Sequence, residues 1–249
     1  MSNAIEVHNL SKRFHLWPKG KSTFKSAALD LLRGKGLTRG EFWALKDVSF
    51  AVKRGETLGL IGPNGSGKTT LLQILAGIIY PTSGTVKVNG KVSTLFELGT
   101  GFHPELTGRE NIFINGAILG LSREEIKAKF DQIVEFSGLK EFLEMPLKHY
   151  SSGMMVRLGF SVAIHVNSQI LLVDEVFAVG DIAFQEKCLK VFNDYQKKGM
   201  TIVFVSHGLE TVREYCNRAI FLEKGVIQAI GDADKVVSAY EEFSQQKKR

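Results

Sequence analysis

The chain has 249 residues, of which 44% are hydrophobic and 23% are charged, and it carries a formal net charge of +6. This composition is typical of a folded α/β domain, and no run approaches the roughly 18 apolar residues of a membrane-spanning helix. The first residues lack the layout of a secretory signal, and Cys188 and Cys216 lack metal-type spacing. We therefore expect a cytoplasmic protein without a structural disulfide.

The N-terminal part of the sequence holds two predicted strands with a basic segment between them. Residues 5–10 alternate as an edge strand does, and residues 48–56 read as a strand that ends in a turn at Gly55. From Lys12 to Arg39 a single acid, Asp30, stands against eight basic residues: Lys12, Arg13, Lys19, Lys21, Lys25, Arg33, Lys35 and Arg39. The imbalance indicates an anionic partner, either nucleic acid or lipid headgroups, although a solvated basic loop fits the charge equally well.

A helix is expected within this segment, which we interpret as an insertion of about residues 15–41. Its apolar residues recur with the spacing of one helix face: Phe24, Ala27, Ala28, Leu31 and Leu32. The cations around that face are typical of a helix that lies on headgroups or contacts a lipid-linked substrate. A helix packed on its own domain, with a solvated basic back, is the alternative.

Strands and helices alternate through the rest of the chain. Residues 57–61, 170–173 and 201–205 are continuous apolar runs, as expected for parallel strands covered on both faces. Two hairpins are predicted from their turn residues, over residues 85–96 around Asn89-Gly90 and over residues 218–231 around Lys224-Gly225. This alternation favours an α/β fold.

Helices are predicted at three places: residues 69–77, most of residues 104–166, and residues 232–243 after an Asp cap. Within the middle block, Ser122 and Glu125 have the spacing of a capping box. Because this block interrupts the strands, we expect an inserted helical subdomain.

A phosphate-binding loop follows the first apolar run directly. It fits the pattern G-x-x-x-x-G-K-[ST] and comprises Gly62, Pro63, Asn64, Gly65, Ser66, Gly67, Lys68 and Thr69. Its glycines let backbone N–H groups approach phosphate oxygens, and the following helix adds the positive end of its dipole. We expect Lys68 to reach the β- and γ-phosphates, Thr69 to ligate Mg²⁺, and Thr70 to complete the binding segment.

Two carboxylates, Asp174 and Glu175, stand at the carboxyl end of a later strand. Ligands of doubly wound sheets bind at that edge. Asp174 is expected to hold Mg²⁺ through water, and Glu175 to orient or deprotonate the attacking water. The next strand ends in Ser206-His207, so we expect His207 at the same edge, in contact with the γ-phosphate. Solvated polar strand ends are the alternative.

In this order the elements resemble the ATP-binding-cassette (ABC) family over nearly the whole chain. The segment Tyr150-Ser151-Ser152-Gly153-Met154 stands where the family has its LSGGQ signature, and it keeps only Ser151 and Gly153. The resemblance implies a single domain, residues 1–249, with a P-loop NTPase parallel-sheet core, an N-terminal antiparallel β subdomain and a helical subdomain at about residues 99–165. It also implies ATP and Mg²⁺ as cofactors, and a second copy whose Ser151 and Gly153 complete the site in an ATP-sandwich dimer.

The same resemblance implies further site residues. Asp181 matches the acid of the family's D-loop. The glutamine expected where the core meets the helical block is absent, and Glu97 is our substitute for it at the metal site. Phe14 is the adenine-stacking aromatic by position, with Trp43 as a rival because an insertion follows Phe14.

Two longer stretches narrow the resemblance. Residues 96–126 and 173–188 are similar to the ATPases of bacterial exporters that carry lipid-linked O-antigen, capsule or teichoic acid. The implied partners are an integral-membrane permease subunit and, through the complex, the lipid-linked glycan, with no nucleic acid. The implied location is the cytoplasmic face of the bacterial cytoplasmic membrane. Two alternatives are a solute importer's ATPase and a non-transport ABC ATPase acting on nucleic acid or the ribosome.

Overall fold

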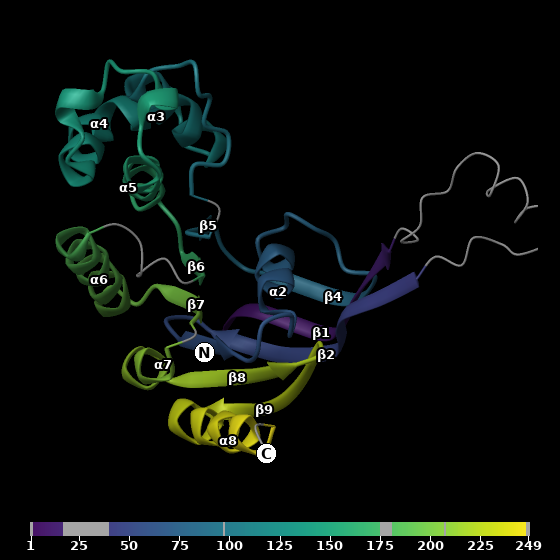
Figure 1. Cartoon of the computed structure of the whole chain (residues 1–249). Coiled ribbons are helices and arrows are strands. Elements are labelled where there is room, and N and C mark those ends of the chain that lie inside the picture. Colours follow the sequence, from purple (N-terminus) through teal and green to yellow (C-terminus); the bar gives the residue numbers. More distant parts are fainter. Residues whose placement is uncertain (1, 17–39, 97, 175–180, 207, 248–249) are drawn as a thin grey trace, which may run out of the picture.

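The computed structural model describes residues 2–16, 40–96, 98–174, 181–206 and 208–247, which form two β-sheets with surrounding helices (Figure 1). The larger sheet has the strand order β5-β6-β7-β3-β8-β9, in which only the β8–β9 pair is antiparallel. Its strands are β3 (Thr57–Ile61), β5 (Val92–Thr94), β6 (Ile170–Asp174), β7 (Thr201–Val205), β8 (Arg218–Glu223) and β9 (Val226–Asp232). The smaller, antiparallel sheet has the order β2-β1-β4 and comprises β1 (Asn3–Leu16), β2 (Gly40–Lys53) and β4 (Ser83–Val88).

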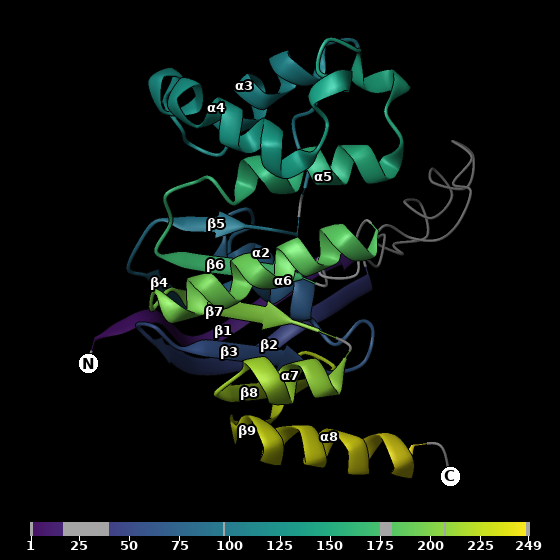
Figure 2. The same ribbon diagram turned by 90° about the vertical axis from the view of Figure 1, so that its left-hand side faces the viewer.

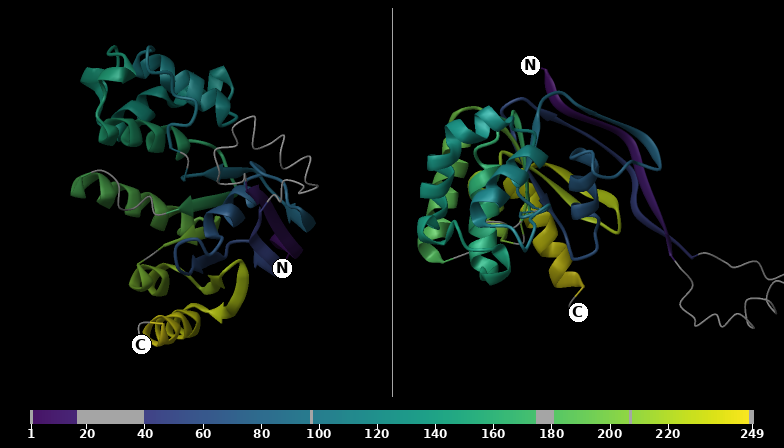
Figure 3. Two further views of the ribbon diagram at one scale, coloured as in Figure 1. Left: turned by 45° about the vertical axis from the view of Figure 1, so that its right-hand side comes forward. Right: turned by 90° about the horizontal axis from the view of Figure 1, so that it is seen from above.

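The helices fall into three groups (Figures 1 and 2). Helix α2 (Lys68–Leu75) lies between the two sheets, and the other face of the large sheet is covered by α6 (Ile182–Lys197), α7 (Leu209–Tyr215) and α8 (Ala233–Gln246). A helical region beyond the β5 edge consists of α3 (Gly108–Ile118), α4 (Arg123–Ser137), α5 (Ser152–Ala163) and two short 3-10 helices (Lys140–Phe142 and Leu147–His149). Figure 3 shows the small sheet and α6 on opposite sides of the large sheet. In the described ranges, no helix combines the length and apolar content needed to span a bilayer.

The large sheet separates two hydrophobic cores because its strands are apolar on both faces. In β6, Ile170 and Leu172 enter the core shared with the small sheet and α2, whereas Leu171 and Val173 enter the core beneath α6 and α7. Successive side chains of a strand point to opposite faces, so a continuous apolar run fills both cores at once. The predicted parallel-sheet core, antiparallel β subdomain and inserted helices are confirmed.

The helical region has a third core, and two of its helices, α3 and α4, begin at capping boxes. The Ser122 side chain accepts from the Glu125 N–H at the start of α4, and Thr107 accepts from Glu110 N–H at the start of α3. In both cases the glutamate also accepts from the cap residue's own N–H, which satisfies two otherwise free donors. The box predicted at Ser122 is confirmed.

Two strand predictions are wrong. Residues 85–96 do not form a hairpin, because β4 pairs with β1 and β5 pairs in parallel with β6. The Asn89 N–H donates to Ala4 O at 2.8 Å and its amide donates to Asn3 O at 3.0 Å, so the chain stays bonded to β1 until it crosses to the other sheet. The predicted edge strand at residues 5–10 instead lies in the middle of the small sheet, between β2 and β4.

Most of the predicted basic insertion of about residues 15–41, namely residues 17–39, lies outside the described part of the chain. Its flanks are the ends of β1 and β2, each 14 residues long. The remaining predicted strands, the hairpin over residues 218–231 and the capped C-terminal helix are confirmed.

The β8–β9 turn packs directly on the phosphate-binding loop. Its residues Lys224 and Gly225 have φ angles of 47° and 79°. The Gly225 N–H donates to Ser66 O at 2.9 Å, and Gly225 O accepts from the Lys46 N–H at 2.8 Å. A Cβ on Gly225 would lie 2.5 Å from Ala44 O, so the approach of these backbones requires glycine.

We predict that Gly225→Ala is more destabilising than Gly199→Ala, by about 2 kcal/mol. Both glycines have left-handed φ angles, and both variants therefore carry the backbone strain of about 1–2 kcal/mol. Only Gly225 also meets another backbone, since a Cβ on Gly199 has open space around it. Urea unfolding of the two variants measures the difference, and equal midpoints would show that the turn does not constrain the loop.

Candidate functional site

The phosphate-binding loop connects β3 to α2 and is confined on two sides. A Cβ on Gly62 would lie 2.0 Å from Leu222 O, and one on Gly67 would lie 2.5 Å from Ala44 O. Both glycines also have left-handed φ angles, of 146° and 108°. The loop therefore owes its path to close contact with the backbones of β8 and β2, which larger residues would prevent.

Lys68, the first residue of α2, stabilises the loop through hydrogen bonds to two of its carbonyl oxygens. Its Nζ donates to Gly62 O at 2.7 Å and to Pro63 O at 3.0 Å. Burial lowers the pKa of the Lys68 ammonium below its ordinary value, and the nearby Asp174 carboxylate opposes that shift. An anionic ligand in the loop would offset this desolvation, so the ammonium is suited to bind phosphate oxygens.

Thr69 and Asp174 present adjacent oxygen atoms. The Thr69 hydroxyl donates to Asp174 Oδ2 at 3.3 Å, which brings the start of α2 to the carboxyl end of β6. A hydroxyl and a carboxylate are hard oxygen ligands of the kind that Mg²⁺ prefers. The pair therefore fits the predicted metal ligands.

A pocket of about 260 Å³ opens over the loop. Its lining comprises Phe42, Ala44, Asn64, Gly65, Ser66, Gly67, Lys68, Thr69, Thr70 and Asp174. The structure thus brings together most of the predicted phosphate and metal residues. The Ser66 hydroxyl is buried and has no hydrogen-bond partner among the described residues, so it is available to a ligand.

Among the described residues that line this pocket, Phe42 is the one aromatic, and it was not predicted from the sequence. Phe14 pairs with Phe42 across β1 and β2, whereas Arg13 pairs with Trp43 and lies over its ring at 5.5 Å. Neighbours along a strand point to opposite faces, so Phe14 and Phe42 share the pocket's face and Trp43 lies on the other. Phe42 could have been identified only from its pairing with Phe14, and the residues between β1 and β2 prevent that pairing from being predicted from the sequence.

Ser151 and Gly153 lie apart from this pocket, at the start of α5. The Ser151 hydroxyl accepts from the Met154 N–H at 3.2 Å, which leaves its own hydrogen free to donate. Ser151 and Ser152 are exposed, and a Cβ on Gly153 would contact nothing closer than 3.9 Å. Within one chain, therefore, Ser151 and Ser152 are exposed to solvent, and none of the residues of the signature segment lines the loop pocket.

Asp181 caps α6, accepting from the Phe184 N–H at 2.8 Å. Its other carboxylate oxygen is 3.6 Å from Arg157 Nη1 on α5. Glu97, Glu175 and His207 lie outside the described residues. The strands that precede Glu175 and His207 are neighbours, since Asp174 pairs with Val205.

Comparisons with known proteins agree with one another. The sequence model of the ABC transporter family matches residues 45–178. The O-antigen export system ATP-binding protein RfbB of Klebsiella pneumoniae is 44% identical over 243 residues, which are 97% of this chain and 99% of that protein. The teichoic acids export ATP-binding protein TagH of Lactococcus lactis is 41% identical over 241 residues, which are 97% of this chain but 51% of the relative.

A solved structure with the same fold is a dimeric ATP-binding cassette in a post-hydrolysis state, bound to ADP and Pi. It matches with a TM-score of 0.71 at 22% identity and covers 92% of this chain and 98% of that one. At this identity the likeness shows the fold alone.

We predict that Phe42→Ala weakens ATP binding about tenfold, because an aromatic–base stacking contact is lost. Trp43→Ala is the matched control, since Trp43 is the adjacent, similarly exposed aromatic on the opposite face. Isothermal titration with ATP gives both dissociation constants. A larger loss for Trp43→Ala would assign the base to the other face of the ribbon.

Proposed function

The chain belongs to the ABC transporter family, and from that premise we propose that it is the ATP-hydrolysing subunit of an exporter for a lipid-linked polysaccharide. The observation that supports the ATPase is the convergence of Lys68, Thr69 and Asp174 on one pocket. The observation that favours a glycan cargo is that relatives named for O-antigen and teichoic acid export match 97% of the chain.

In the proposed reaction the loop residues hold the triphosphate and the sheet edge activates water. Backbone N–H groups of residues 64–67 and the Lys68 ammonium would bind phosphate oxygens, while Thr69 and Asp174 would hold the metal. Mg²⁺, when bound, neutralises charge that develops between the β- and γ-phosphates. Glu175 accepts a proton from the attacking water as the bond to the β-phosphate oxygen breaks, and His207 donates a hydrogen bond to the γ-phosphate. The products are ADP and inorganic phosphate.

The exposure of Ser151 and Ser152, away from the loop pocket of their own chain, supports a dimer. Ser151 and Gly153 do not reach the loop pocket of their own chain, so we propose that they close the pocket of a second copy, with Asp181 nearby. The Ser151 hydrogen and the N–H groups at the start of α5 would then donate to the γ-phosphate from the opposite side. Departure from the family signature at Ser152 and Met154 leaves both of these donors in place.

We predict that Glu175→Gln retains ATP binding but lowers the turnover number by about two to four orders of magnitude, because the water loses its base. Cells carrying only this variant should accumulate the lipid-linked glycan inside the cytoplasmic membrane. Lys68→Ala is the contrasting variant, since it removes a phosphate ligand and should weaken ATP binding itself. Near-normal hydrolysis by Glu175→Gln would contradict its role, and unchanged surface polysaccharide would contradict the cargo.

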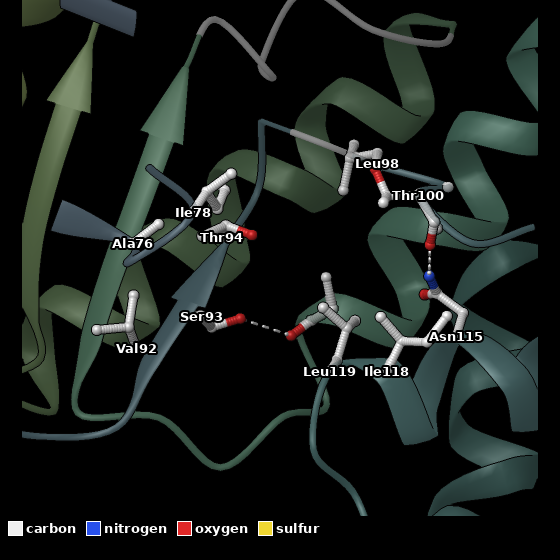
Figure 4. Close-up of a pocket in the computed structure, with 13 residues that line it drawn as sticks. Ala76, Ile78, Val92, Ser93, Thr94, Leu98, Thr100, Asn115, Ile118 and Leu119 are labelled. Carbon is white, nitrogen blue, oxygen red and sulfur yellow. Dashed lines mark hydrogen bonds between the residues drawn. The ribbon is translucent and has the colours of Figure 1, made fainter. Parts of the chain in front are cut away.

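We further propose that a permease subunit docks in a second pocket, of about 240 Å³, between the large sheet and the helical region (Figure 4). It is lined by residues of β5, by Leu98, Gly99 and Thr100, by the end of α3 and by α5. Two large apolar side chains on its lining are substantially exposed, Ile78 at 46% and Ile118 at 55%. Such exposed apolar surface beside a hollow suits a short amphipathic segment of a partner.

One polar atom in this pocket is unsatisfied. The Asn115 amide donates to Thr100 O at 2.8 Å, but its buried Oδ1 has no partner in the part of the chain that the structure describes. A docked segment with one hydrogen-bond donor among apolar residues would satisfy it. The loop from Leu98 to Thr100 directly follows Glu97 in the sequence. A permease segment docked on this loop would therefore contact residues adjacent to the proposed metal-site residue. The proposed location is thus peripheral, at the cytoplasmic face of the bacterial cytoplasmic membrane.

We predict that Ile118→Glu abolishes co-purification with the membrane subunit while the isolated chain keeps its ATPase activity, because a carboxylate would be buried in an apolar contact. Ile230→Glu on β9 is the matched control, since Ile230 is 42% exposed and does not line this pocket. Affinity purification of the complex from membranes measures the effect. Equal recovery with both variants would place the permease elsewhere.

A further inference from the structure

Arg157 joins three elements that meet where the helical region lies against the sheet core. It lies in the second turn of α5, shortly after the signature segment. Its Nε donates to Ser137 O at the end of α4, at 3.0 Å, and its Nη1 lies 3.6 Å from Asp181 Oδ2. Its guanidinium carbon lies 5.4 Å from the centre of the Phe184 ring on α6.

Each contact suits a guanidinium in particular. Ser137 O belongs to the last turn of α4, where carbonyls lack helical partners and the dipole is negative. The planar fork can donate there while stacking on an aromatic ring and pairing with a carboxylate, which an ammonium cannot do. The chain leaves room for it, since a Cβ on Gly138 would lie 2.5 Å from Arg157 Nη2.

The other end of this contact is the first turn of α6. Asp181 caps that turn through the Phe184 N–H, and Phe184 is 3% exposed and packs edge-on against Phe160 and Phe136. Arg157 therefore contacts both the cap and the buried anchor of α6. Together with the Phe160–Phe184 ring contact, Arg157 therefore holds α5 against the first turn of α6.

We propose that Arg157 is a positioning residue that fixes Asp181 relative to Ser151 and Gly153, so that one protomer presents these residues to its partner as a single surface. This inference rests on the proposed dimer. An isolated, part-exposed ion pair contributes little to stability, so a purely structural role would give a small loss of stability and nothing else. Positioning instead predicts a defect in ATP-dependent dimerisation.

The experiment compares Arg157→Met and Arg157→Lys with Arg109→Met. Arg109 is a matched control because it also pairs with a carboxylate, Glu144 at 2.8 Å, and lies over a ring, Phe130 at 4.9 Å, but both partners belong to the helical region. Sedimentation of the chain with a non-hydrolysable ATP analogue measures the dimer dissociation constant. Titration under monomeric conditions measures analogue affinity, which should not change because Arg157 does not line the loop pocket.

We expect Arg157→Met to raise the dimer dissociation constant about tenfold, since both an ion pair and a cation–π contact are lost. Arg157→Lys should give a smaller rise because it keeps the charge without the fork. Arg109→Met should leave the constant unchanged at a similar loss of stability. Equal dimerisation by the Arg157 and Arg109 variants would overturn the proposal.

A second measurement does not require the dimer and applies even to a variant of reduced stability. Hydrogen exchange at the Phe184 amide, relative to amides elsewhere in α6, should be faster in Arg157→Lys than in the wild type and unaffected in Arg109→Met. Unchanged exchange at Phe184 would overturn the positioning role. If the wild-type chain neither dimerised nor hydrolysed ATP, while exchange at Phe184 was still faster in Arg157→Lys than in the wild type, the proposed function would be contradicted and the positioning role would stand.

Discussion

The close packing of three backbones around the phosphate-binding loop is the constraint on which the rest of the structure depends. Residues 62–67 lie between β2 and the β8–β9 turn, with Gly225 donating to Ser66 O and accepting from Lys46. These contacts therefore fix the positions of the small sheet, the large sheet and the loop relative to one another without a bound ligand. Preorganised donors of this kind need no rearrangement when an anion binds, so the loop is suited to hold phosphate groups.

The sequence predicts most of the fold because its strongest signals are local. Runs such as residues 170–173 fill two cores at once, and the loop pattern needs only a strand before it and a helix after it. The Asn89-Gly90 turn misled because the same dipeptide serves a hairpin and a crossing between sheets, and only pairing with distant β1 and β6 decides which. Phe42 was missed for a similar reason, since its face depends on pairing with Phe14 across the residues between them.

In the proposed dimer, the site of each chain is completed by the other copy. The pocket gathers a cationic loop, two oxygen ligands and an aromatic, while the signature segment faces away from it on α5. If the phosphate donors are divided in this way between two copies, nucleotide binding and subunit association are thermodynamically linked. The helical region that carries α5 also lines the pocket proposed for the permease, so the same group of helices would take part in both proposed contacts.

The length of the β1–β2 ribbon restricts where insertions and deletions can occur in the gene. Each strand has 14 residues, about 46 Å at the usual rise per residue, against five in β3, β6 and β7. Side chains alternate with a period of two, so deleting the single codon between Trp43 and Leu45 would exchange the faces of Phe42 and Trp43 relative to the rest of β2. Insertions and deletions within residues 17–39 leave the β1–β2 pairing as it is. Length polymorphism should accordingly be tolerated between the two strands and purged from the few codons at their ends.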